Sequence, residues 1–387
     1  MITCKVEWFY TTPCIMSRCI YCLKNDTQTL FTKKEHVIPA SLGSFEPLNP
    51  TILDTDGLVC SNCNEEIFGP LETNFIEDSL EGVYAQRLNL RDRNSVIMRD
   101  KNFKIVRLAG LGDDFFDQMF LFLEMKEGKV VPVLKDQIKL KRFQGGSRVF
   151  LPEALRKITK DSSAFKKISA DMQKLDRKDM AVFAETTEKK DKIVALLHEF
   201  GVSYEEKESR ERKFEAGDSF MIEEDYTCTI NHDIGRVLAK IAFNYFSYCA
   251  LQDNQQVILY SSHFDSIRNF AHSDTGILRE VIASISEEPI LYEERVRNQR
   301  LHAHVINFLP ENDSVVVRMT FFGRPSVYKI ILGTLPTELD HDHFGCGHAF
   351  DPFSRQILQL SQQQPQPQTE NKIRASFGLF KRFVVPE

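Results

Sequence analysis

The chain has 387 residues, 42% of them hydrophobic and 27% charged, with a net charge of −6. The length allows two domains or one large elaborated one, and the composition is ordinary for a soluble globular protein. No stretch approaches the length of a membrane span, and the first residues lack a basic segment followed by an apolar run. We therefore expect neither a membrane protein nor a secreted one.

The first predicted unit is a metal-bound segment at residues 19–80. The chain has nine cysteines, an odd number, and four of them form two Cys-x-x-Cys pairs. This pattern favours a reducing compartment, and hence a cytoplasmic location, over a disulfide framework. The pairs supply the four thiolates of a tetrahedral structural Zn²⁺ site, at Cys19, Cys22, Cys60 and Cys63. The alternative is two unrelated cysteine pairs.

Three residues in the same segment have the chemistry of a hydrolytic site. Asn64 follows Cys63 directly and is predicted to open the helix NEEIFGPLE. The oxygens of Glu35 and Asn64 are hard donors that suit Mg²⁺, and a neutral His36 beside such an ion can take a proton from water. A base and a hard metal suit phosphodiester hydrolysis. The alternatives are a surface acid, a partly buried histidine and a helix N-cap.

The strings CIYC, EHVIPASLGS and LVCSNCN together resemble the HNH endonucleases, which have a ββα-metal fold with zinc-binding cysteine pairs. The resemblance covers residues 19–80. It implies that His36 is the general base, that Glu35 and Asn64 hold one Mg²⁺ or Mn²⁺, and that the cysteines are structural. It also implies cleavage that leaves 5′-phosphate and 3′-hydroxyl ends.

The resemblance has one departure, in the residue that braces the loop of the base. The family often has an Asn nine residues before the last motif residue, where this chain has Thr55. Thr55, Asp54 or Asp56 could brace the loop. This departure favours the alternative of a nucleic-acid or protein adaptor that has lost catalysis.

The middle of the chain is predicted to be strand-rich at residues 100–150 and helical from Pro152 to Phe200, with Gly201 as a C-cap. The clearest strands are KIVRLAGL and KVVPVLKDQIKL. Residues 126–178 hold fifteen Lys and Arg against six Asp and Glu. A basic segment in an acidic protein can face phosphates, and it can equally be a solvated helix face.

A strand at 219–230 and a helix at 232–250 follow. On this helix Arg236, Lys240 and Asn244 recur every four residues and form one polar stripe. The stripe is expected to face solvent, with phosphate contact as the alternative. Further short strands are predicted between residues 286 and 333.

The last part of the chain adds two weaker signals. The cluster His341, His343, Cys346 and His348 matches no zinc motif, so a turn is favoured over a second metal site. The tail contains basic and aromatic residues that suit nucleic acid, although packing on the core is the favoured role.

We therefore expect an α+β protein that begins with a zinc-stapled ββα-metal (HNH) module at 1–98. An α+β accessory region at 99–356, a Gln/Pro-rich linker at 357–372 and a basic–aromatic tail at 373–387 follow. The expected activity is metal-dependent hydrolysis of double-stranded DNA. One alternative is a nuclease that acts on RNA, and the other is a non-catalytic zinc-dependent adaptor that binds nucleic acid or protein. Defence against foreign DNA is a plausible role.

Overall fold

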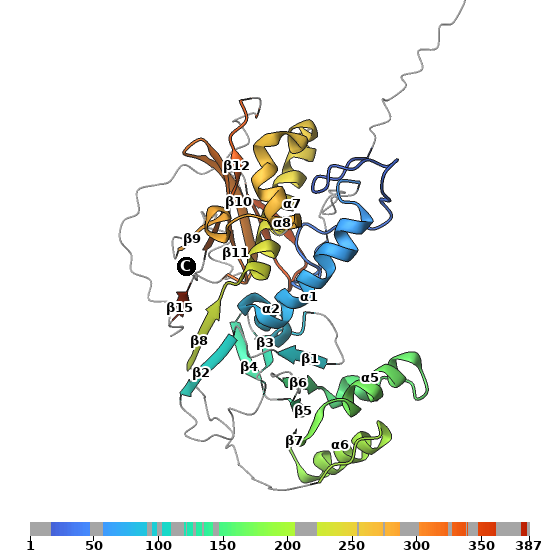
Figure 1. Ribbon diagram of the computed structural model, residues 1–387. Helices are drawn as coiled ribbons and strands as arrows, with labels where there is room; N and C mark the ends of the chain where they lie inside the picture. Colours follow the sequence, from blue (N-terminus) through green and yellow to red (C-terminus); the bar gives the residue numbers. More distant parts are fainter. Residues whose placement is uncertain are drawn as a thin grey trace, which may run out of the picture.

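The computed structural model of the chain is shown in Figure 1. It describes residues 17–46, 57–90, 95–98, 103–109, 120, 122–126, 129–133, 135–141, 147–205, 223–253, 255–273, 275–286, 302–323, 327–337, 339, 347–360 and 381–384. Helices pack on sheets whose described strands are mostly antiparallel, so the α+β class is confirmed.

The largest sheet has six antiparallel strands in the order β14-β13-β10-β11-β12-β9. Its members are β9 (Ile282–Ser286), β10 (His304–Glu311), β11 (Ser314–Thr320), β12 (Val327–Thr334), β13 (Gly347–Phe350) and β14 (Ile357–Leu360). The β10–β11 hairpin turns at Asn312 and Asp313, whose φ angles are 47° and 59°. These residue types tolerate positive φ, so the local sequence favours this tight turn.

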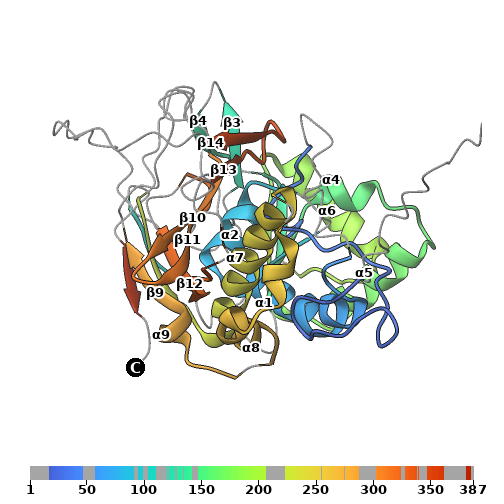
Figure 2. The same cartoon turned by 90° about the horizontal axis from the view of Figure 1, so that it is seen from above.

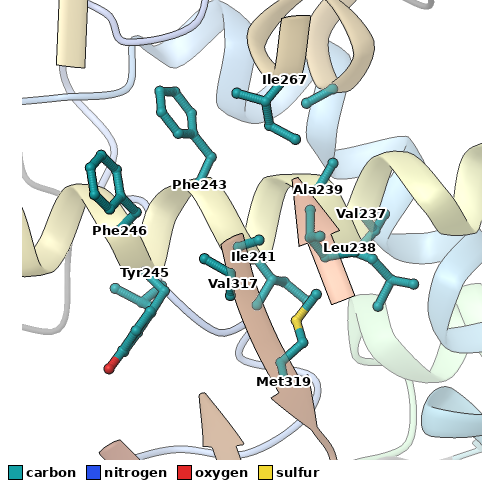
Figure 3. Close-up of a cluster of buried hydrophobic side chains, with 14 of the residues drawn as sticks. Val237, Leu238, Ala239, Ile241, Phe243, Tyr245, Phe246, Ile267, Val317 and Met319 are labelled. Carbon is teal, nitrogen blue, oxygen red and sulfur yellow. The ribbon is translucent and has the colours of Figure 1, made fainter. Parts of the chain in front are cut away.

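Helix α7 (His232–Gln252) lies against this sheet and is buried on every side. Asn231 begins it by accepting a hydrogen bond from the backbone N–H of Ile234 at 2.8 Å. Every residue from Ile234 to Ala250 is buried. In Figure 3, Ile241 lies beside Val317 and Met319 of a strand below the helix, whereas Phe243 and Phe246 point to the opposite side. A helix that is apolar nearly all round belongs inside a protein.

The polar stripe on α7 does not face solvent, contrary to our expectation. Arg236, Lys240 and Asn244 are all buried. The reason is that α7 has neighbours on all sides: the sheet, helix α8 (Asp265–Ser273) and helix α1 (Gly69–Asp78). Figure 2 shows α7 between strands β10 to β12 and helix α1. The short helices η2 (Gln256–Tyr260), η3 (Ser262–Phe264) and α9 (Leu278–Val281) complete this region.

The N-terminal segment packs directly on α7. A π-helical turn, η1 (Cys63–Phe68), continues into α1, and Ser79 caps α2 (Leu80–Arg87) by accepting a hydrogen bond from Gly82 at 2.9 Å. One hydrophobic core includes Cys19, Cys60 and Cys63 of the two Cys-x-x-Cys pairs, together with residues of α1, α7 and the six-stranded sheet. The N-terminal segment and the C-terminal half thus share a core. The domain boundaries drawn from the sequence stay predictions.

The middle of the chain forms a second body, drawn in green in Figure 1. Its four-stranded sheet, β1-β6-β5-β7, consists of β1 (Ser95–Met98), β5 (Gln137–Lys141), β6 (Ser147–Phe150) and β7 (Asp176–Phe183). Helices α4 (Pro152–Arg156), α5 (Ser163–Gln173) and α6 (Thr187–Glu199) accompany it. Their apolar side chains make a separate cluster. Gly201 follows α6 with a φ of 74°, as predicted for a C-cap.

The remaining strands form two small sheets. The stretch KVVPVLKDQIKL is split between β5 and β4 (Lys129–Val133), which pairs with β3 (Phe122–Lys126). Strand β8 (Glu223–Thr229) lies between β2 (Phe103–Ala109) and β15 (Lys381–Val384).

The start of the predicted linker and a part of the predicted tail form strands. The first four residues of the linker form β14, and β15 of the tail pairs in parallel with β8. Residues 361–380 lie outside the described part of the chain. Within the described residues, no helix has the length and apolar character needed to cross a membrane.

Candidate active site

The four cysteines of the two pairs come together, as predicted. The Sγ atoms of Cys19 and Cys63 are 3.7 Å apart, as are those of Cys22 and Cys60. All four sulfurs lie within 4.8 Å of one another. Zinc–sulfur bonds of about 2.3 Å in a tetrahedron place sulfurs about 3.8 Å apart. The cluster is therefore consistent with a structural Zn²⁺ site.

Local backbone bonds shape this cluster. The N–H of Leu23 donates to the carbonyl of Cys19 at 3.0 Å, which closes the first Cys-x-x-Cys turn with a φ of 61° at Leu23. The N–H of Ile20 donates to the carbonyl of Leu58 at 2.8 Å, so the turn is tied to the second pair. Arg268 of α8 donates from Nε to the Ile20 carbonyl at 2.6 Å. The C-terminal half of the chain therefore supports the cysteine cluster directly.

The thiols strongly perturb one another. The hydrogen bond with Cys22 raises the pKa of Cys19 to about 12, and the same bond lowers the pKa of Cys22. Hydrogen bonding to Cys19 raises the pKa of Cys63. Four adjacent thiolates repel each other, and a bound cation with the softness of zinc removes this repulsion by coordinating them.

His36 and Asn64 face one cavity of about 290 Å³ beside the cysteine cluster. The cavity lies between the loop at residues 34–41 and the helices η1 and α1. His36 is exposed, whereas the neighbouring Glu35 is buried in the cavity wall. Asn64 Nδ2 donates to the carbonyl of Lys34 at 3.1 Å, which links η1 to the loop at residues 34–41. The three residues singled out from the sequence are thus brought together.

Glu35 is held by a lysine that lies 205 residues away. Its Oε1 lies 2.5 Å from Nζ of Lys240, and the two side chains are only 3% and 2% exposed. Lys240 also contacts Glu72, which lines the same cavity and is 28% exposed. The Lys240 ammonium lies 5.1 Å from the centre of the Phe68 ring. Glu35 is therefore engaged by a protein cation within the wall of the cavity.

The two carboxylates carry one more charge than Lys240 neutralises. Burial raises the pKa of Glu35, even though the attraction of Lys240 acts in the opposite direction. Burial alone would lower the pKa of Lys240, but the attraction of Glu35 and Glu72 outweighs it and raises this pKa. The excess negative charge favours a further cation at the open side of the cavity.

Asn244 of α7 also contacts the loop at residues 34–41, and it is fully buried. Its Nδ2 donates to Oε1 of Glu35 and to the backbone carbonyl of His36, each at 3.1 Å. Its Oδ1 accepts from the hydroxyl of Tyr21 at 2.8 Å. This orientation of the amide is the one that places its two hydrogens against two acceptors. Burial raises the pKa of Tyr21, which keeps the hydroxyl protonated as a donor.

Lys240 and Asn244 were missed as site residues. The signal was present in the sequence, because both lie on the polar stripe of a helix that is otherwise apolar. Arg236, the third member, has a different task. It donates to the carbonyls of Ala271 at 3.1 Å and His272 at 2.9 Å, in the last turn of α8. It thereby holds the helix that carries Arg268.

Other residues singled out from the sequence lie apart from this cavity or beyond the description. Thr55, Asp54 and Asp56 lie outside the described residues, as do His341, His343 and Cys346. His348 is in β13, where its Nδ1 lies 2.9 Å from the Tyr245 hydroxyl.

No family model, curated protein or solved structure matches this chain.

Proposed function

We propose that the protein is a metal-dependent nuclease that hydrolyses phosphodiester bonds of DNA. The observation that carries this proposal is the exposed His36 on a cavity that it shares with Asn64 and three acidic residues, next to a cluster of four cysteines that suits Zn²⁺. The resemblance of residues 19–80 to the HNH endonucleases supports the same reaction. We also propose that residues 19–80 have the ββα-metal fold of this family, of which the structure describes residues 19–46 and 57–80.

His36 would act as the general base. It takes a proton from a water molecule, the water oxygen attacks phosphorus, and the bond from phosphorus to the 3′ oxygen breaks to leave 5′-phosphate and 3′-hydroxyl ends. The 3′ oxygen leaves as an alkoxide that takes up a proton from solvent. Exposure of His36 to the cavity supports this role, because a base must reach the water that it deprotonates.

The donors on the cavity fit a hard divalent cation such as Mg²⁺ or Mn²⁺. Asn64 uses its amide nitrogen on Lys34, which leaves its oxygen as the atom to present to a cation. Glu72 is the more accessible of the two carboxylates that Lys240 contacts, because it is 28% exposed and Glu35 is 3% exposed. A cation in the cavity would therefore meet Glu72 before Glu35. When bound, such a cation would neutralise charge that develops on the phosphate and the leaving oxygen.

Cleavage of supercoiled plasmid in Mg²⁺ or Mn²⁺ tests this function. We expect the wild type to cut, EDTA to stop cleavage, and His36→Ala to be inactive with an unchanged zinc content. His198→Ala is the matched control, because His198 is an exposed histidine on α6 away from the cavity. Equal cleavage by wild type and His36→Ala would refute the role of the base. Parallel assays on single-stranded RNA separate the RNA-directed alternative.

One observation favours a second candidate, a non-catalytic zinc-dependent adaptor. The Lys240 ammonium already neutralises Glu35, the residue expected to bind the catalytic metal. An adaptor would bind nucleic acid through surfaces such as the exposed lysines and arginines of α4 and α5. In that case the wild type and His36→Ala would both carry zinc and bind plasmid, and neither would cut it. Such binding should weaken steeply with salt.

A further inference from the structure

Helix α7 contacts the loop at residues 34–41 at two points, through the buried side chains of Lys240 and Asn244. Asn244 bonds to the backbone carbonyl of His36 itself. Lys240 bonds to Glu35, the preceding residue. Both side chains belong to a helix that is fixed on its other side by the six-stranded sheet. The position of His36 therefore depends on a rigid element from the opposite half of the chain.

The bonds of Asn244 are complete. Its two amide hydrogens and its oxygen are used on Glu35, His36 and Tyr21. A fully buried amide that has every partner has one stable orientation, because rotation would leave several polar atoms unpaired. The carbonyl of His36 is therefore held in one place, and with it the start of the side chain.

Glu35 has contacts unlike those of an open metal ligand. Its Oε1 accepts from both Lys240 and Asn244, and the side chain is 3% exposed. Withdrawing the carboxylate toward a cation in the cavity would leave a buried ammonium and a buried amide without this partner. Such a loss is strongly unfavourable in a protein interior.

We propose that α7 is the positioning element of the His36 site, with Glu35 as its point of attachment rather than a direct ligand of the metal. This inference rests on the proposed nuclease function and deepens it. Asn244 and Lys240 fill the bracing role that the sequence alone assigned to residues near Thr55. The C-terminal half is then a part of the site and not an accessory to it.

The first test is Asn244→Leu, which keeps the approximate shape and removes all three bonds. We expect kcat for plasmid cleavage to fall about 100-fold, because a small misplacement of a catalytic group has effects of this size. KM should change less than twofold, since Asn244 has no access to substrate. The matched control is Ser247→Ala on the same buried helix, where the hydroxyl donates only to the Phe243 carbonyl within the helix. Its kcat should stay within twofold of wild type.

A readout independent of activity is the NMR signal of the His36 ring in protein labelled with ¹³C-histidine. We expect one sharp signal in wild type and Ser247→Ala, and a broadened or split signal in Asn244→Leu. Zinc content and melting temperature identify variants that have simply unfolded. A sharp, unshifted signal together with a normal kcat in Asn244→Leu would overturn the proposal.

The role of Glu35 is tested by combining two substitutions. If Glu35 is an attachment point, the double variant Glu35→Gln/Lys240→Met should retain much more activity than the product of the two single effects predicts. If Glu35 binds the metal, Glu35→Gln should lose activity equally with or without Lys240, which would overturn its assignment. These outcomes differ from failure of the nuclease proposal, in which the wild type itself would not cut.

Discussion

Replacing Lys240 by Met tests whether one lysine holds the buried charges of the candidate site. The side chains of Lys240 and Glu35 are 2% and 3% exposed, so water cannot take over the role of the ammonium. Methionine is unbranched and apolar and can keep the contact with Phe68. Removing one partner of a buried ion pair typically costs about 3–5 kcal/mol. We expect a loss of this size in the free energy of unfolding at pH 7, a large part of the about 5–15 kcal/mol typical of native proteins.

The loss should depend on pH in a defined direction. The pKa of Glu35 is already raised by burial, and removal of Lys240 raises it further. The folded variant then holds a proton that the unfolded chain releases near pH 4.3, which is about the pKa of an exposed glutamate. The stability of the variant is therefore greatest below this pH and is lost as the pH rises through the folded pKa. Lys240→Met should be closer to wild type at pH 5 than at pH 8.

Urea denaturation followed by circular dichroism measures both effects. The matched control is Lys329→Met in β12, where Lys329 pairs with Glu311 and the two side chains are 25% and 28% exposed. This pair is partly solvated, so we expect a loss of less than about 1 kcal/mol. If Lys240→Met loses no more than this control and shows no added pH dependence, the charges of Glu35 do not depend on Lys240.

Three further predictions concern other parts of the fold. Cys63→Ser should bind less Zn²⁺ than the wild type in a metal assay, and amide hydrogen exchange should rise at residues 19–46 and 57–60 but not in the separate core of the four-stranded sheet. His304 is buried, bonds to the Leu42 carbonyl at 3.1 Å and has its pKa lowered to about 4 by burial. A histidine with a lowered pKa binds fewer protons folded than unfolded, so wild-type stability should fall by about 3 kcal/mol from pH 6.5 to pH 4, and His304→Phe should lack this component in urea titrations. Gly82→Ala would place a Cβ 2.4 Å from the backbone oxygen of Ile76, so the melting temperature should fall in line with a loss of about 1–3 kcal/mol. An unchanged melting temperature would mean that α1 and α2 can separate freely.

The cysteine cluster shows how much a local pattern can determine. The spacing of each Cys-x-x-Cys pair is a property of a short turn, and the thiolate chemistry requires a common partner. The sequence alone therefore predicted that Cys19, Cys22, Cys60 and Cys63 meet, and the structure confirms it. The same holds for α7 and for the end of α6 at Gly201, because periodicity and capping act over a few residues.

The contacts of Glu35, the acid next to His36, were decided by tertiary structure. Glu35 and His36 are adjacent in the chain, yet one is buried against α7 and the other is exposed to the cavity. No local pattern specifies this, because the partners Lys240 and Asn244 lie more than 200 residues away. Helical periodicity placed these two residues on one stripe but did not say what the stripe faces. That depended on α1 and the loop at residues 34–41 packing over α7, which buries polar side chains only because each finds a hydrogen-bonding or charged partner there.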